Sequence, residues 1–148
     1  FCEQRQIEIL ELRGYGLDGF VWQTSEDSMV KVFRHENDFQ RELEAYRRLE
    51  SHQVDQLQGF FVPLLLHYDE NLFVLELSYV RPPYILDFAA ATLDQVPPGF
   101  DPEDPTWIAE KQRVFGVHWA EVARLLDALR HLGIYYPDVH AENIRIGP

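Results

Sequence analysis

A glycine-rich stretch between two strand-like segments narrows the folds open to this chain more than any other feature. Residues 14–21 read Gly-Tyr-Gly-Leu-Asp-Gly-Phe-Val, residues 7–12 before them mix apolar and acidic side chains in near alternation, and residues 20–22 resume an extended pattern. A dinucleotide-binding fold needs such glycines to open a helix, whereas a strand follows here. The stretch therefore predicts a hairpin, whose turn either covers the phosphates of a ligand or is simply a loose glycine turn.

The rest of the first half combines further strands with one helix. Residues 29–33 have the pattern of a third strand, and residues 60–68 and 71–80 that of two more, joined by a turn at Asp69-Glu70-Asn71. Between them, apolar side chains recur at helical spacing as far as Ser51, and Asn37 is the expected helix cap. We predict an α+β fold with an antiparallel sheet of five strands and one main helix.

The second half is expected to be mainly helical. A short helical stretch is expected near residues 85–93, followed by a loop at 96–105 that is crowded with proline and aspartate. Asp104 is a plausible cap for a long helix over residues 105–132, whose apolar side chains recur at three- and four-residue steps. Gly133 is expected to end this helix.

Lys31 stands out because it is a charge in an otherwise apolar strand. Strand alternation places its side chain on the same face as Met29 and Phe33, where burial is expected. A buried ammonium needs a carboxylate or a ligand phosphate nearby. Glu42 is the candidate, because its spacing places it on the apolar face of its helix. The alternative is that Lys31 reaches solvent at a sheet edge and Glu42 does the same from its helix.

A second polar group follows the long helix. Asp138 and Asn143 lie five residues apart in a loop that precedes a short apolar strand. An aspartate in such a loop can accept a hydroxyl proton, and an asparagine carbonyl can bind a hard cation. The alternative is turn chemistry, since both residue types favour turns by bonding their own backbone.

The order and spacing of these features resemble the protein-kinase superfamily. GYGLDGFV is similar to its glycine-rich loop, VKVF to its third-strand lysine, FQRELEAYRRL to its first helix with the paired glutamate, and YPDVHAEN to its catalytic loop. The resemblance implies a kinase-like N-terminal lobe over residues 1–77, and a hinge and partial C-terminal lobe over residues 78–148 that ends after the catalytic loop.

The resemblance also assigns roles to residues, with ATP and Mg²⁺ as cofactors. Asp138 would be the catalytic aspartate, Lys31 would hold the phosphates while paired with Glu42, and Asn143 would be a magnesium ligand. The remaining nucleotide contacts would come from the glycine-rich loop, from the residue above adenine and from the hinge backbone: Gly14, Gly16, Gly19, Val21, Glu76, Leu77 and Ser78.

Several residues depart from the family pattern. Met29 replaces the usual alanine two positions before the lysine, which would narrow the adenine pocket beneath Val21. Tyr136 and Pro137 replace the histidine and arginine before the catalytic aspartate. His140 makes the loop D-x-H-x-x-N, which is similar to aminoglycoside phosphotransferases and other atypical kinases. The phosphate acceptor is accordingly either a protein or a small-molecule hydroxyl.

In the family an Asp-Phe-Gly motif follows the catalytic loop, and this sequence ends at Pro148 without reaching one. It also does not begin with methionine. Together these features indicate a fragment of a longer kinase. Three functions therefore stand: an ATP-dependent phosphotransferase, a nucleotide-binding pseudokinase without effective transfer, and an interaction domain that uses the acidic stretch 94–104 as a contact loop. In a kinase the aspartate of that motif holds magnesium, so its absence weighs on activity.

Composition limits the partners and the compartment. The net charge of −12 should repel free nucleic acid. The apolar stretch 60–66 is far shorter than a membrane span, and nothing reads as a signal peptide. A single cysteine excludes an internal disulfide, and the six histidines lack metal-ligand spacing. We expect a cytoplasmic chain that binds neither nucleic acid nor membrane.

Overall fold

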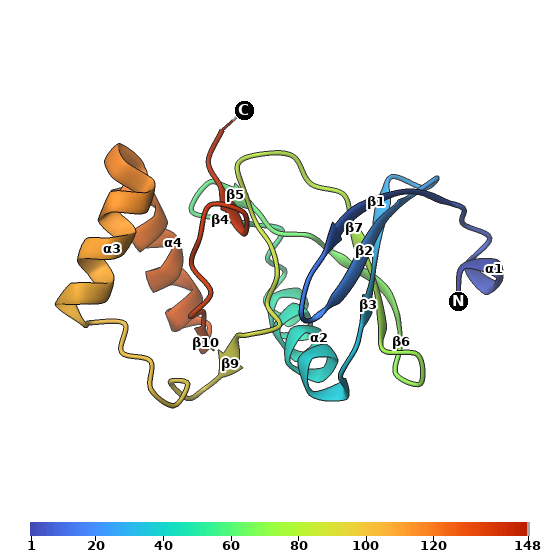
Figure 1. The fold of residues 1–148 in the computed structure, drawn as a ribbon, viewed down its shortest axis with the longest axis horizontal. Helices are drawn as coiled ribbons and strands as arrows, with labels where there is room; N and C mark the ends of the chain where they lie inside the picture. Colours follow the sequence, from blue (N-terminus) through green and yellow to red (C-terminus); the bar gives the residue numbers. More distant parts are fainter. Residues whose placement is uncertain (148) are drawn as a thin grey trace.

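The computed structural model describes residues 1–147 and has an α+β fold (Figure 1). Its largest sheet has five antiparallel strands in the order β1-β2-β3-β7-β6. The elements of the first half are α1 Cys2–Arg5, β1 Ile9–Tyr15, β2 Gly19–Thr24, β3 Ser28–Phe33, α2 Glu36–Ser51, β4 Gln56–Leu57, β5 Phe60–Phe61, β6 Leu65–Asp69 and β7 Val74–Ser78. The predicted five-stranded antiparallel sheet and its one main helix are confirmed.

The bounds of several elements differ from the prediction. The expected strand at 60–68 is divided into β5 and β6, and Pro63, which has no amide hydrogen for a ladder, lies between them. The turn before β7 extends over residues 70–73 and includes Phe73 at a positive φ of 52°, so the strand begins later than expected. Helix α2 begins at Glu36 with His35 as its N-cap, and Asn37 is not the cap.

The remaining elements are β8 Tyr84–Ile85, β9 Thr92–Leu93, α3 Pro105–Phe115, a 3₁₀ turn Gly116–His118, α4 Trp119–His131, β10 Ile134–Tyr135 and β11 Ile144–Arg145. The short helix expected near residues 85–93 is wrong. The ends of that stretch pair instead as strands, β8 with β11 and β9 with β10, and Asp87 between them has a left-handed φ of 62°. A helix cannot pass through that conformation.

The long C-terminal helix is also interrupted. Helix α3 ends at Phe115, and Gly116, at a positive φ of 55°, starts the 3₁₀ turn before α4. Its beginning agrees with the prediction, because the carboxylate of Asp104 accepts a hydrogen bond from the amide of Thr106. Gly133, at φ 76°, follows the end of α4 as expected.

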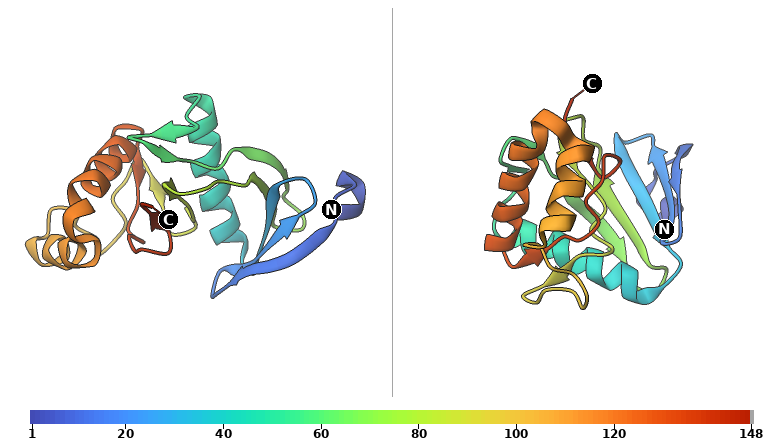
Figure 2. Two further views of the ribbon diagram at one scale, coloured as in Figure 1. Left: turned by 90° about the horizontal axis from the view of Figure 1, so that it is seen from above. Right: turned by 60° about the vertical axis from the view of Figure 1, so that its left-hand side comes forward.

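One hydrophobic core joins the two halves of the chain. Helix α2 lies between the five-stranded sheet and the helices α3 and α4 (Figures 1 and 2). The buried cluster includes Phe39 and Leu43 of α2, Leu75 of β7, and Leu125 and Leu129 of α4. Because these side chains form one cluster, the sheet and the C-terminal helices are packed around common side chains.

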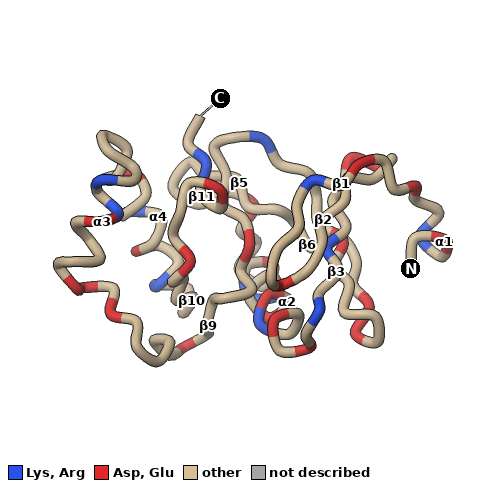
Figure 3. Tube along the Cα trace, viewed as in Figure 1, with Lys and Arg blue, Asp and Glu red and all other residues tan. Residues whose placement is uncertain are grey.

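Acidic and basic residues are interspersed along the whole trace (Figure 3). None of the helices within residues 1–147 combines the length and the apolar character that crossing a membrane requires.

Candidate functional site

Lys31 lies on β3, the central strand of the large sheet, and is buried with 6% of its surface exposed. Its Nζ donates to Glu42 Oε2 at 2.6 Å and to Asp87 Oδ1 at 3.0 Å. Glu42 comes from the buried face of α2, as its helical spacing predicts, and is 1% exposed. The alternative in which both charges reach solvent separately is therefore wrong.

The two carboxylates determine the electrostatics around this ammonium. Burial works to lower the pKa of Lys31, but the charges of Glu42 and Asp87 outweigh it, and the pKa lies above its ordinary value. Burial raises the pKa of Glu42 to about 7, although the charge of Lys31 pulls it down. Lys31 is therefore a permanent cation, and Glu42 is the partner that can take up a proton near neutral pH.

A cleft of about 700 Å³ opens beside this ion pair. Several residues assigned to nucleotide binding line it, as do both members of the ion pair: Gly14, Val21, Lys31, Glu42, Leu77, Ser78 and Asn143. Met29 also lines it. Gly16, Gly19, Glu76 and Asp138 are not among the residues that line the cleft.

The glycine-rich stretch is the tight turn between β1 and β2. It is closed by a hydrogen bond from the amide of Gly16 to the carbonyl of Gly19 at 3.0 Å. Only Gly19 is required by packing, since a Cβ there would collide with the backbone carbonyl of Val32. A side chain at Gly14 or Gly16 would meet nothing closer than 4.0 Å, so the fold itself does not require these two glycines.

Asp18 at the tip of this turn was not predicted as a site residue. Burial raises its pKa, and Asp87 raises it further while Lys31 lowers it.

The proposed hinge directs its side chains to both faces of the sheet. Glu76 pairs with Val30 in the β3–β7 ladder, so its side chain leaves the sheet on the face opposite Lys31. There its carboxylate accepts hydrogen bonds from Ser28 Oγ at 2.9 Å and from Arg5 Nε at 3.0 Å. Any contact of Glu76 with a ligand in the cleft would therefore use its backbone, as the sequence prediction requires.

Asp138 and Asn143 lie in the loop between β10 and β11. Asn143 Nδ2 donates to Asp138 Oδ2 at 2.8 Å and lies 3.0 Å from His140 Nε2. That imidazole nitrogen is also 3.3 Å from Asp138 Oδ1. The turn contacts of the alternative are present, and Asn143 in addition lines the cleft.

Asp87 is a residue of the cleft and of the Lys31 contact that the sequence prediction missed. It lines the cleft, contacts Lys31, and directly follows Leu86, whose amide donates to the carbonyl of Asn143 at 2.8 Å. Tyr136 also donates its hydroxyl to the carbonyl of Leu86 at 2.7 Å. The sequence signal for Asp87 was a single aspartate within the apolar run Ile85-Leu86-Asp87-Phe88. It was missed because this run was predicted to be helical.

The chemistry of these side chains fits a magnesium nucleotide. Mg²⁺ is bound in proteins by one or two carboxylates together with substrate phosphates and water, so a preformed cage of protein ligands is not required. Among residues 1–147 no group of three or more His, Cys, Asp or Glu side chains is arranged to hold a metal by itself. At the cleft, Asp87 and Asn143 carry oxygens of the carboxylate and amide types that Mg²⁺ binds.

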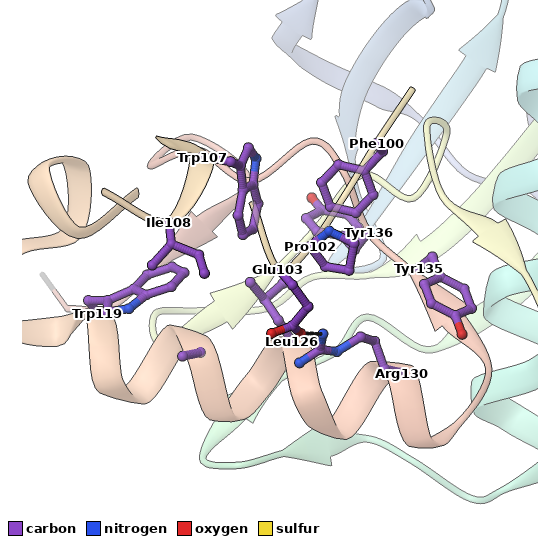
Figure 4. Close-up of a pocket in the computed structure, with 11 residues that line it drawn as sticks. Phe100, Pro102, Glu103, Trp107, Ile108, Trp119, Leu126, Arg130, Tyr135 and Tyr136 are labelled. Atoms are coloured by element: carbon purple, nitrogen blue, oxygen red, sulfur yellow. Dashed lines mark hydrogen bonds and ion pairs between the residues drawn. The ribbon is translucent and has the colours of Figure 1, made fainter. Parts of the chain in front are cut away.

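A second, smaller hollow of about 230 Å³ lies between α3, α4 and the preceding loop (Figure 4). Its walls are aromatic, with Trp107 set edge-on to both Phe100 and Trp119. An ion pair between Arg130 and Glu103, at 2.8 Å, lies at its side. No residue proposed from the sequence as a ligand contact lines it.

Comparison of the chain with protein-family models and with curated proteins gives no match.

Proposed function

We propose that the chain is the nucleotide-binding part of an ATP-dependent phosphotransferase with a protein-kinase-like fold. The observation that supports this most is the buried Lys31 ammonium, which Glu42 and Asp87 fix at the wall of a cleft large enough for a nucleotide. In this proposal residues 1–77 form the N-terminal lobe, and residues 78–148 form the hinge and part of the C-terminal lobe.

The proposed transfer uses few groups. Lys31 and the turn amides near Gly14 would hold the phosphates, Val21 and Met29 would enclose the base, and the backbone of Leu77 and Ser78 would bind its edge. The oxygen of an acceptor hydroxyl would bond to the γ-phosphorus as the bond to the bridging oxygen breaks, with the electron pair leaving on ADP. Asp138 would take the hydroxyl proton. Magnesium, when bound, neutralises charge on the phosphates.

A second candidate is a nucleotide-binding module without effective transfer. Two observations favour it: Met29 lines the cleft, where the family pattern has alanine, and Asp138 lies outside the residues that line the cleft and contacts Asn143 instead. Both candidates predict nucleotide binding, but only the phosphotransferase predicts that ATP is converted to ADP.

ATP binding to the Lys31→Ala variant tests the proposal. We expect the wild-type chain to bind ATP, as seen by calorimetry and by a raised thermal midpoint, because a ligand of the folded state stabilises it by mass action. Loss of the ammonium should weaken binding by about tenfold or more. Lys111→Ala, which removes a lysine on α3 outside the cleft, is the matched control and should bind ATP normally.

The Asp138→Asn variant separates the two candidates. For the phosphotransferase, the wild-type chain should form ADP from ATP slowly with water as acceptor, and Asp138→Asn should reduce that rate by about 100-fold while ATP binding stays unchanged. ATP binding without any ADP formation supports the second candidate. A Lys31→Ala variant that binds ATP as well as the wild type would overturn both.

A further inference from the structure

We propose that Asp87 is a carboxylate ligand of the magnesium ion that accompanies bound ATP, acting together with Asn143. This rests on the proposed function and adds to it a residue that lies far ahead of Asp138 in the sequence. Four sets of observations carry it: backbone pairing, charge balance, an unsatisfied hydroxyl and a fixed backbone conformation.

Backbone pairing brings the two oxygen ligands together. Strand β8 runs antiparallel to β11, with Ile85 opposite Ile144. The next bond of this ladder is from the amide of Leu86 to the carbonyl of Asn143 at 2.8 Å. Asp87 follows Leu86 immediately, so Asp87 and Asn143 lie at the same end of the two-stranded ladder, and both line the cleft.

The charge balance requires a cation when phosphates enter. Lys31 Nζ is in contact with two carboxylates, at 2.6 Å from Glu42 and at 3.0 Å from Asp87. The charged residues that line the cleft offset one another, so a triphosphate would remain uncompensated: Arg13, Lys31, Arg145, Glu42, Asp87 and Glu142. A divalent ion bound between Asp87 and the phosphates removes the repulsion, and carboxylate and amide oxygens are ligands that Mg²⁺ prefers.

Tyr46 provides an independent sign that the cleft is built for a ligand. Its side chain lines the cleft and is only 2% exposed, yet its hydroxyl has no hydrogen-bond partner among the described residues. A buried unpaired hydroxyl is costly. Because Tyr46 lines the same cleft as Asp87, an oxygen of a ligand or of water that reaches this hydroxyl would satisfy it.

The backbone holds Asp87 in one orientation. Its left-handed φ of 62° is an uncommon conformation that the surroundings must maintain. They do so through Phe88, which is fully buried and packs edge-on against Tyr46 and Tyr136, with ring centroids at 5.2 and 5.5 Å. The backbone at Asp87 is thereby held beside Lys31, and its carboxylate lies 3.0 Å from Lys31 Nζ.

The segment Asp87-Phe88-Ala89 differs only in its third residue from the Asp-Phe-Gly expected after the catalytic loop. It precedes that loop in the sequence, yet β8 reaches the loop in space by pairing with β11.

ATP binding with and without metal tests this assignment. The wild-type chain is titrated with ATP by calorimetry, once in EDTA and once in excess MgCl₂, and should bind at least about tenfold more tightly with magnesium. Asp87→Asn, whose side chain tolerates the left-handed backbone, should lose this enhancement and bind ATP in EDTA at least as well as the wild type. Asp55→Asn, an exposed aspartate outside the cleft, should keep the enhancement.

Three results would overturn the assignment. If Asp87→Asn keeps the magnesium enhancement, or if the wild type binds ATP equally well with and without magnesium, Asp87 is not the ligand although nucleotide binding stands. If the wild type binds no ATP in either condition, the proposed function fails as well. Should Asp87→Asn not fold, Asp87→Gly takes its place in the same titrations, since glycine favours a positive φ.

Discussion

Lys31 is a single ammonium that two carboxylates share. Glu42 is almost fully buried, whereas the side chain of Asp87 is 32% exposed. The more exposed carboxylate can exchange its contact with Lys31 for one with a ligand at lower cost, because water can solvate it as it turns. Glu42 has no such route, and its burial raises its pKa to about 7.

The stability of the chain should consequently depend on pH through Glu42. Its pKa is about 7 in the folded chain against an ordinary 4.5, so between these values the folded state binds the proton more tightly than the unfolded chain. Stability should fall as pH rises through this window, by at most about 3 kcal/mol. Urea unfolding at pH 5 and pH 8 measures the change.

Glu42→Gln, which cannot titrate, is the control for that prediction. It should lack this component of the pH dependence, so the wild type should lose stability relative to it between pH 5 and pH 8. If the unfolding free energies of the two proteins change in parallel between pH 5 and pH 8, Glu42 stays ionised throughout the window.

The Lys31–Glu42 pair could be predicted from the sequence because each residue belongs to a long periodic element. Strand alternation fixes the face of Lys31, and helical spacing fixes that of Glu42. Asp87 could not be predicted in the same way. Its position depends on the pairing of β8 with β11, two strands of two residues each that lie far apart in the chain.

At the scale of elements, the glycines of the β1–β2 turn differ in how closely the neighbouring backbone packs against them. Gly19 has a φ of 155° and lies directly against the backbone of Val32, whereas Gly16 has open space around it.

The long strands and α2 could be predicted from the sequence because their side chains follow a regular period. The end of α3 at Gly116 could not be predicted, because the apolar spacing of α3 and α4 does not encode the positive φ of that glycine.

Gly19→Ala should destabilise the chain by about 2 kcal/mol or more, because the new methyl group would force β2 and β3 apart. Gly16→Ala is the matched control, and its free energy of unfolding should stay within about 0.5 kcal/mol of the wild type. Urea denaturation followed by circular dichroism measures both. Equal stability of the two variants would mean that the turn adapts to a side chain at either position.

At the scale of the whole molecule, aromatic packing links the sheet side to the helical side. Tyr46 of α2, Phe88 after β8 and Tyr136 after β10 pack in sequence, and all three are buried. Arg48 of α2 adds a hydrogen bond to the carbonyl of Leu132 at 2.9 Å. Because these contacts cross between the two proposed lobes, we expect the lobes to unfold together.

Phe88→Ala tests this coupling. Removing a fully buried phenylalanine should cost about 3–5 kcal/mol of unfolding free energy, and the loss should lower the stability of sheet and helices alike.

Tryptophan fluorescence measures the two sides separately. Trp22 reports on β2 in a variant that keeps only this tryptophan, and Trp107 and Trp119 report on α3 and α4 in a variant that keeps only these two. The urea transitions of the two groups should coincide in the otherwise wild-type chain and shift together in Phe88→Ala. Phe61→Ala, at a position that is 43% exposed, is the control and should shift both by much less. Transitions that separate before any substitution at Phe88 would show that the two sides fold independently, and the cleft would then lie between units that move relative to each other.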